Sequence, residues 1–287
     1  MKIELTRYTE LETYIQQFHQ GLYEILIVEG KPGTGKSSIV KHGFSHLDPT
    51  TDFLWVEGRV TAAALYRQLY EYVDMPVILD DTDNFLSDKQ SLNLLKTLCQ
   101  TDSTKKVSWL TMRLPNDLPP FFYTSSRVIM ITNETRKANV HLQSIQDRGL
   151  HILFRPTKQE IHHYAKKFCN IEVYEFITRF MSSIEDLTLR LYNTAQKAYD
   201  KGIPYQKTLL LSWDLDPLVK VFYEIELESP HLSRDEKKLL FLKVTNKQER
   251  TYDRVLTQVQ HTLQESTTTP GKATHTTPGR TGKKEKV

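Results

Sequence analysis

The sequence is poor in cysteine and lacks long apolar runs. Its 287 residues include two cysteines, Cys99 and Cys169, outside any CxxC spacing, which excludes a disulfide framework. No apolar run approaches the ~20 residues that span a bilayer, and the first residues, MKIELTRYTE, lack the apolar core of a signal peptide. We therefore expect a reduced, cytoplasmic protein without membrane contacts.

An excess of positive charge is also absent from most of the chain. The net charge is +3, but the tail 266–287 alone holds five basic residues and one acid, so the rest carries −1. The tail is rich in Thr, Pro and Gly and too polar to bury a core, so we expect it to be disordered. Contact with DNA would therefore need a local basic patch or this tail.

Short apolar runs alternate with helix-like stretches over the first half of the chain. The strand-like runs are Tyr23–Val28, Phe53–Val56, Val77–Leu79, Arg127–Thr132 and His151–Phe154. Between them lie helix-like stretches at Ser37–Phe44, Ala62–Val73 and Ser87–Cys99, with Ser87 as the expected N-cap of the last. This alternation predicts an α/β fold with a parallel five-stranded sheet flanked by helices. An extra strand and a surface loop are expected from Val107 onward.

After Phe154 the pattern becomes helical. Thr157 and Glu160 have the spacing of a helix start, and the helical pattern lasts until Gly202 and Pro204 interrupt it. A second capping box and a turn at Thr245–Asn246 indicate a further helical section. We therefore predict a core at 1–154, an all-helical lid at 155–211, a small helical C-terminal segment at 212–265 and the basic tail at 266–287.

A glycine-rich loop stands between the first core strand and the first core helix. The loop Gly30-Lys31-Pro32-Gly33-Thr34-Gly35-Lys36-Ser37 fits GxxxxGK[ST] and is followed by Ser38. Glycines let successive backbone N–H groups point at a phosphate, and the following helix adds the partial positive charge of its N-terminus. Lys36 supplies a cation for the β- and γ-phosphates, and the Ser37 hydroxyl is a Mg²⁺ ligand. The motif predicts binding of ATP with Mg²⁺; the alternative is an accidental glycine turn.

Acidic residues follow the apolar run Val77–Leu79. A carboxylate at the end of a neighbouring parallel strand can hold Mg²⁺ through water, and we assign this role to Asp80. The next carboxylate, Asp81, can orient and deprotonate an attacking water. The alternative is that Asp81 and Asp83 cap the following loop, and for Asp83 this is the favoured interpretation.

These motifs and their order resemble those of AAA+ ATPases, over the stretch from Tyr23 to Leu211. VEGKPGTGKS resembles Walker A, and VILDD resembles Walker B, with Asp where Glu is commoner, as in replication initiators. RVIMITN resembles the sensor-1 strand, and Asn133 at its tip would contact the γ-phosphate or the lytic water. SIQDRG is similar to the arginine-finger segment, and FRPTKQEI to the start of the lid. EDLTLRLYNTA resembles the sensor-2 helix, where Arg190 would contact the phosphates.

The resemblance implies an ATP-hydrolysing enzyme whose subunits depend on one another. Arg148 would reach the γ-phosphate of a neighbouring subunit, so we expect an ATP-promoted homo-oligomer, either a ring or a filament. The alternatives are a salt bridge that closes the loop for Arg148 and a solvated surface position for Arg190.

The sequence leaves several alternatives for the molecule on which the expected ATPase acts. The compact architecture resembles loader, initiator and transposition-regulator ATPases, so a DNA transaction, with DNA or a DNA-bound protein as partner, is the leading hypothesis. Basic residues at helical spacing around the turn at 245–246 could contact phosphates or form a solvated face: Lys243, Lys247, Arg250 and Arg254. The alternatives are a nucleotide-dependent switch or scaffold acting on a protein partner, and a protein-remodelling ATPase.

Overall fold

A computed structural model describes residues 1–81, 88–109, 118–134, 145, 147–181 and 184–267. The chain forms two compact units. Unit 1 comprises Met1–Tyr174 and Asp186–Ile203, and unit 2 comprises Glu175–Glu185 and Pro204–Val287. Within the described residues, no helix combines the length and apolar character that crossing a bilayer requires.

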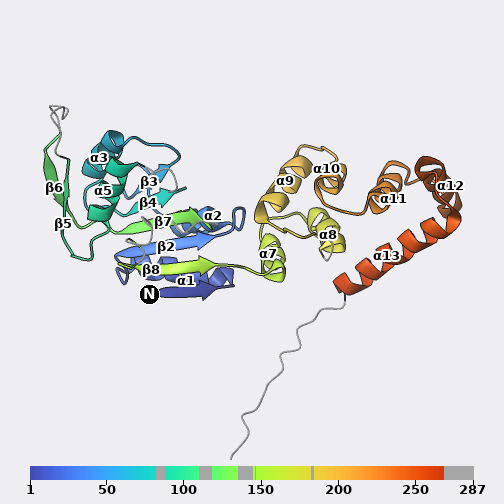
Figure 1. The fold of residues 1–287 in the computed structure, drawn as a ribbon, viewed down its shortest axis with the longest axis horizontal. Coiled ribbons are helices and arrows are strands. Elements are labelled where there is room, and N and C mark those ends of the chain that lie inside the picture. The colour runs from blue at the N-terminus through green and yellow to red at the C-terminus, as the bar shows by residue number, and fades with distance from the viewer. Residues whose placement is uncertain (82–87, 110–117, 135–144, 146, 182–183, 268–287) are drawn as a thin grey trace, which may run out of the picture. The chain divides into compact units, whose positions relative to one another are not determined.

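Unit 1 is an α/β structure around a six-stranded sheet (Figure 1). In spatial order the strands are β1 (Lys2–Leu5), β8 (Leu150–Phe154), β2 (Ile25–Gly30), β7 (Val128–Asn133), β4 (Val77–Asp80) and β3 (Leu54–Glu57). Every pair of neighbours is parallel, so the carboxyl ends of all six strands meet at one edge. This architecture is compatible with a Rossmann-like or a P-loop fold.

The expectation of five strands was wrong, because the first residues of the chain add an edge strand. β1 pairs with β8 in the register Lys2↔His151 to Leu5↔Phe154. Of its four residues only Leu5 is buried, so the segment has no apolar run that predicts a strand. Its partner lies almost 150 residues away, and this tertiary pairing is what makes the segment a strand.

Helices cover both faces of the sheet. α1 (Tyr8–His19) packs against α2 (Lys36–Gly43), and α3 (Ala62–Glu71) packs against α5 (Lys89–Leu98). The right-handed crossovers of parallel strands place these two pairs on opposite faces. Ile25 and Ile27 of β2 belong to the core under α3 and α5, while the intervening Leu26 and Val28, equally buried, point to the other face. The helix expected from Ser87 begins after Asp88, whose carboxylate accepts a hydrogen bond from the Ser91 N–H.

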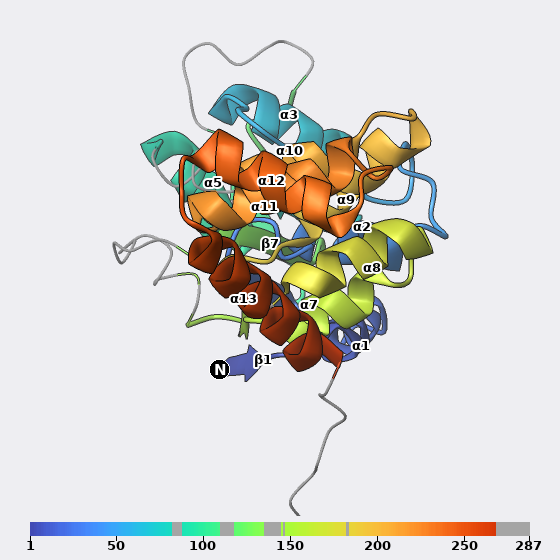
Figure 2. The same cartoon turned by 90° about the vertical axis from the view of Figure 1, so that its right-hand side faces the viewer.

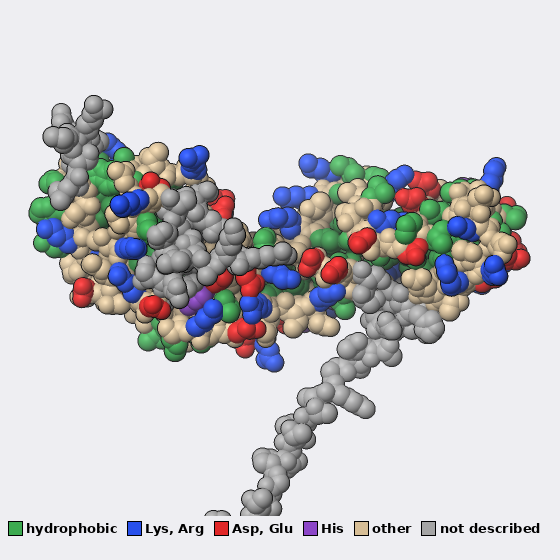
Figure 3. All heavy atoms as spheres, in the orientation of Figure 1, with side chains coloured by type: hydrophobic (Ala, Val, Ile, Leu, Met, Phe, Trp, Pro, Cys, Tyr) green, Lys and Arg blue, Asp and Glu red, His purple; other side chains and the backbone are tan. Residues whose placement is uncertain are grey.

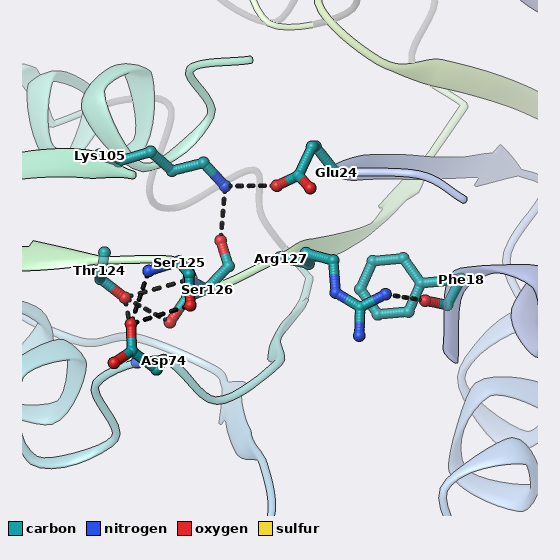
Figure 4. Close-up of polar contacts among 8 residues, drawn as sticks. All are labelled: Phe18, Glu24, Asp74, Lys105, Thr124, Ser125, Ser126 and Arg127. Atoms are coloured by element: carbon teal, nitrogen blue, oxygen red, sulfur yellow. Dashed lines mark hydrogen bonds and ion pairs between the residues drawn. The ribbon is translucent and has the colours of Figure 1, made fainter. Parts of the chain in front are cut away.

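The extra strand expected near Val107 is half of an antiparallel hairpin outside the main sheet. β5 (Lys105–Ser108) pairs with β6 (Phe121–Thr124) in the register Lys106↔Tyr123. At the start of β5 the fully buried Lys105 donates to the Glu24 carboxylate at 2.9 Å and to the Ser126 carbonyl at 2.6 Å (Figure 4). Because Glu24 comes just before β2 and Ser126 just before β7, this contact holds the hairpin at the amino-terminal edge of the sheet.

Neighbouring residues reinforce this edge. The Asp74 carboxylate accepts hydrogen bonds from the backbone N–H and the hydroxyl of Ser125 at 2.6 and 2.9 Å, as Figure 4 shows. Arg127 donates to the carbonyl of Phe18 at the end of α1, and its guanidinium lies over the Phe18 ring. The edge is therefore closed by polar groups that bond to one another.

The helical region begins as its sequence predicts. The Thr157 hydroxyl accepts a hydrogen bond from the Glu160 N–H, which confirms it as the N-cap of α7 (Lys158–Ala165). α8 (Ile171–Phe180) starts in unit 1 and ends in unit 2, and α9 (Leu189–Asp200) belongs to unit 1. α9 ends before Gly202, and α10 (Tyr205–Ser212) starts after Pro204 in unit 2.

Unit 2 contains a group of three helices with its own apolar core. α11 (Pro217–Glu228), α12 (Arg234–Thr245) and α13 (Glu249–Thr267) pack around Phe222, Phe241 and Tyr252. Ser233 and Glu236 form the predicted capping box of α12, and Asn246 ends that helix in the left-handed conformation. The chain after Thr267, with most of the predicted tail, lies outside the described residues.

Candidate functional site

A polar cavity of about 440 Å³ lies at the carboxyl edge of the sheet in unit 1. Its walls come from the loop between β2 and α2, from the ends of β4 and β7, and from the first three turns of α9. Predicted site residues from all four segments line it: Lys36, Asp80, Asn133 and Arg190 among them. The structure therefore brings together groups that are separated by up to 154 positions in the sequence.

The glycine-rich loop has the backbone that its residue types predict. Gly35 has φ +91°, in the left-handed region, and α2 begins at the next residue. A Cβ on Gly30 would lie 2.3 Å from the Phe154 carbonyl oxygen of the neighbouring strand, so only glycine fits there. The Thr34 hydroxyl donates to the Lys31 carbonyl at 2.9 Å, which closes the loop on itself.

Lys36 is buried beside this loop and is held by neutral oxygens. Its Nζ donates to the carbonyls of Gly30 and Lys31 at 2.8 and 2.9 Å and to Oδ1 of Asn133 at 3.2 Å. Among the described residues no carboxylate lies within ion-pair distance of it. Burial lowers the pKa of Lys36 to about 8; the Asp80 charge works against this shift, and Arg190 adds to it. The ammonium would gain from a nearby anion.

The side chains of Ser37 and Asp80 are in contact at the wall of the same cavity. The Ser37 hydroxyl donates to Oδ1 of Asp80 at 2.9 Å. Burial raises the pKa of the Asp80 carboxyl, and the hydrogen bond from Ser37 acts in the opposite direction. A hydroxyl and a carboxylate are hard oxygen ligands of the kind that Mg²⁺ combines with water and substrate phosphates. The pair therefore fits the predicted Mg²⁺ site, which needs no larger cluster of ligands.

Asp81 borders the cavity in an uncommon backbone conformation. It is exposed and has φ 60°, a value that only a few per cent of non-glycine residues adopt. Thr82 and Asp83, the latter expected to cap the loop, lie outside the described residues.

Asn133 ends β7 level with the start of the glycine-rich loop. The register pairs it with Gly30, and its amide oxygen accepts from Lys36. Asn133 thus lines the cavity together with the loop and Asp80, and its contact with a γ-phosphate or a lytic water stays a prediction.

Arg148 does not line this cavity. It comes just before β8, and because β8 runs parallel to β2 with Leu150 beside Leu26, Arg148 lies at the amino-terminal edge of the sheet. Its side chain is exposed and donates to the Lys96 carbonyl at 2.8 Å, and most of the loop that a salt bridge would close lies outside the described residues. The cavity of its own subunit is at the other edge.

α9 brings Arg190 to the cavity together with residues that the sequence analysis missed. Asn193, Thr194 and Lys197 line the same wall. They follow Arg190 at i+3, i+4 and i+7, a helical spacing that predicts a shared face. The start of α9 also touches the loop, because the Leu189 N–H donates to the Gly33 carbonyl at 2.9 Å.

Tyr8 was missed as well and supports the loop from the start of α1. Its hydroxyl donates to the Thr34 carbonyl at 2.9 Å, and its ring stacks on Tyr164 at a centroid distance of 4.0 Å. Burial, with the nearby Tyr164 and Glu160, raises the pKa of Tyr8, so this hydroxyl stays protonated and donates. No local sequence pattern connects Tyr8 with residues 26 positions further on.

Comparison with known proteins gives little further information. No protein-family model matches the chain. A stretch of 90 residues is 31% identical to a phage T4 protein described as an uncharacterized 36.7 kDa protein in the nrdC-mobD intergenic region. The match covers 30% of this chain and 27% of that protein. The functional argument therefore depends on the cavity itself.

Proposed function

We propose that the chain is an ATPase of the AAA+ type that binds and hydrolyses ATP with Mg²⁺. The observation that carries the proposal is the single cavity lined by Lys36, the Ser37–Asp80 pair, Asn133 and Arg190. The fully buried elements behind it, β2, β4 and β7, hold these groups on a rigid edge. A buried ammonium without a carboxylate partner among the described residues, a Mg²⁺-type oxygen pair and a helix N-terminus together suit a triphosphate.

The residues have distinct roles in the proposed reaction. The loop N–H groups and Lys36 bind the β- and γ-phosphates, and Arg190 approaches them from α9. Ser37 and Asp80 would hold Mg²⁺, which would supply positive charge next to the phosphate oxygens. Asp81 takes a proton from the attacking water, whose oxygen bonds to the γ-phosphorus as the bond to the leaving ADP oxygen breaks. Asn133 orients that water.

The position of Arg148 supports an oligomer. Since it lies at the edge of the sheet away from its own cavity, its proposed partner is the γ-phosphate in a neighbouring subunit, and nucleotide is bound between subunits. We propose that this oligomer couples hydrolysis to a DNA transaction such as loading, initiation or regulation of transposition.

ATP turnover by the purified full-length protein tests the proposal. We expect Mg²⁺-dependent hydrolysis that duplex or single-stranded DNA stimulates at low salt and less at moderate salt. The Lys36→Ala and Arg148→Ala variants should lack this activity. Absence of Mg²⁺-dependent turnover in the wild type would overturn the ATPase proposal. Turnover that DNA leaves unchanged would overturn only the DNA coupling and would favour a switch acting on a protein partner.

A further inference from the structure

The helices α12 and α13 are joined by a turn of three residues, Asn246 to Gln248. Asn246 adopts φ 52° and ψ 38°, the left-handed conformation that ends a helix sharply. Figure 2 shows α13 crossing beneath α12 and α11, and Phe241 of α12 packs on Tyr252 of α13 with ring centroids 5.4 Å apart. Three helices with a tight turn before the third are the arrangement of a helix-turn-helix group.

The acidic side chains near this turn are already engaged elsewhere. Glu249 and Asp253, both on α13, form ion pairs with Lys238 of α12. Glu236 is held in the capping box with Ser233, and Lys237 pairs with Glu226 of α11. Among the described residues, these contacts leave Lys243, Lys247, Arg250 and Arg254 without an acidic partner.

Four cations form what we name the turn surface: Lys243, Lys247, Arg250 and Arg254. All four are exposed, and within the described part of the chain none forms an ion pair. On the face of unit 2 that Figure 3 draws, Lys and Arg side chains are interspersed with Asp and Glu, so overall charge does not mark a binding face there. The turn surface is distinguished instead by the lack of ion pairs at its four cations among the described residues.

Two of the four cations share one face of α13. Arg250 and Arg254 are one helical turn apart, on the side of α13 opposite the buried Val255 and Val259. Lys243, in the last turn of α12, precedes the turn, and Lys247 lies within it. The exposed face of the helix that follows the turn therefore carries two cations, and two more lie close before it in the sequence.

We infer that the turn surface binds the phosphodiester backbone of duplex DNA, with the outer face of α13 directed at a groove. In helix-turn-helix proteins the helix after the turn enters the major groove, and flanking cations contact the phosphates on either side. Unpaired Lys and Arg side chains can neutralise phosphates without first breaking ion pairs within the protein. The inference deepens the proposed function, since the DNA coupling rests on such a surface, whereas ATP hydrolysis does not.

Fluorescence anisotropy with a labelled 30-base-pair duplex and full-length protein tests the inference. We compare the wild type with R250Q/R254Q and with K166Q/K201Q, which removes two exposed cations of unit 1 that also lack ion pairs among the described residues. The affinity of R250Q/R254Q should fall by at least about tenfold, and the slope of log K against log salt should flatten by about 2. The control should keep the slope of the wild type.

All three proteins carry residues 268–287, so binding by the basic tail is common to them. Circular dichroism melting curves establish that both variants are folded, and basal ATP turnover should be equal in all three. If R250Q/R254Q binds DNA with the affinity and salt slope of the wild type, the turn surface does not bind DNA, whatever the ATPase measurement shows. If the control loses as much affinity, net charge rather than the turn surface is responsible, and the inference is equally overturned.

Discussion

Two buried lysines lie at opposite edges of the same sheet and have different partners. Lys105, at the amino-terminal edge, is fully buried and forms an ion pair with Glu24. Lys36, at the carboxyl edge, is almost as buried, but its three acceptors are two carbonyls and an amide oxygen. A buried charge is costly unless it is paired, so the first lysine resembles a structural group and the second a group that needs a ligand.

The pKa of Lys36 reflects this difference. Burial lowers it to about 8, although Asp80 lies near enough to oppose the shift. A phosphate would supply the missing negative charge. The comparison therefore contrasts a lysine that we expect to stabilise the fold with one that we propose binds a phosphate, and the predictions below test both roles.

The largest effect is expected for Arg148, a cation of the amino-terminal edge that we place in catalysis. An arginine finger raises the rate of P-loop enzymes by about 10³–10⁵-fold, and Arg148→Ala should lower ATP turnover by a factor in this range. Mixing Arg148→Ala with Lys36→Ala protein should restore turnover, because an intact finger can then reach an intact cavity. Mixtures as inactive as their components would show that Arg148 does not act between subunits.

Lys36→Ala should lower turnover by roughly 10³-fold, since it removes a preorganised cation from the phosphates. Its thermal stability should be equal to or above that of the wild type, because an incompletely paired buried charge is lost. Calorimetric melting and steady-state turnover measure the two effects. A marked drop in melting temperature would mean that Lys36 is structural, like Lys105.

Lys105→Met should have the reverse effects of Lys36→Ala: it should lower stability and leave ATP binding unchanged. It leaves Glu24 and the Ser126 carbonyl without their donor, and we expect a loss of about 3 kcal/mol in the free energy of unfolding. ATP affinity per folded molecule should be unchanged. Urea unfolding measures the loss, and the double variant Lys105→Met/Glu24→Leu should recover part of it because the unpaired carboxylate is also removed. Equal instability of both variants would argue against the ion pair as the cause.

The smallest expected effect is the dependence of ATP affinity and of stability on pH. As pH rises through about 8 the free protein loses the charge on Lys36, so ATP affinity should fall by roughly tenfold between pH 8 and pH 9.5. The free energy of unfolding should change in the opposite direction. Because the pKa of Lys36 in the folded protein is below its ordinary value of 10.5, unfolding takes up a proton between about pH 8 and 10.5. The contribution of Lys36 to the free energy of unfolding therefore rises with pH. Isothermal titration with a non-hydrolysable ATP analogue measures the affinity, and Lys36→Arg, whose guanidinium stays charged, should show a flat profile.

Much of unit 1 could be predicted because its signals are local. β2 and β4 are short apolar runs followed by the loop and by Asp80, and parallel strands bring such ends together at one edge. Lys197 had a usable signal in its helical spacing from Arg190. β1, the Lys105–Glu24 pair and Tyr8 had none, since each depends on contacts between segments that are far apart in the sequence.

The strand order also has a consequence for synthesis on the ribosome. β2, at positions 25–30, lies between β7 and β8, so its first partner is complete only at residue 133 and its second only at residue 154. Until the first partner is complete, the emerging chain carries an unpaired strand in which Ile25 to Val28 all belong to the final core. Pairings this distant in sequence form slowly, and the interval favours association with chaperones or with other chains. The strand that precedes the glycine-rich loop is thus exposed to aggregation while the rest of the sheet is still being made.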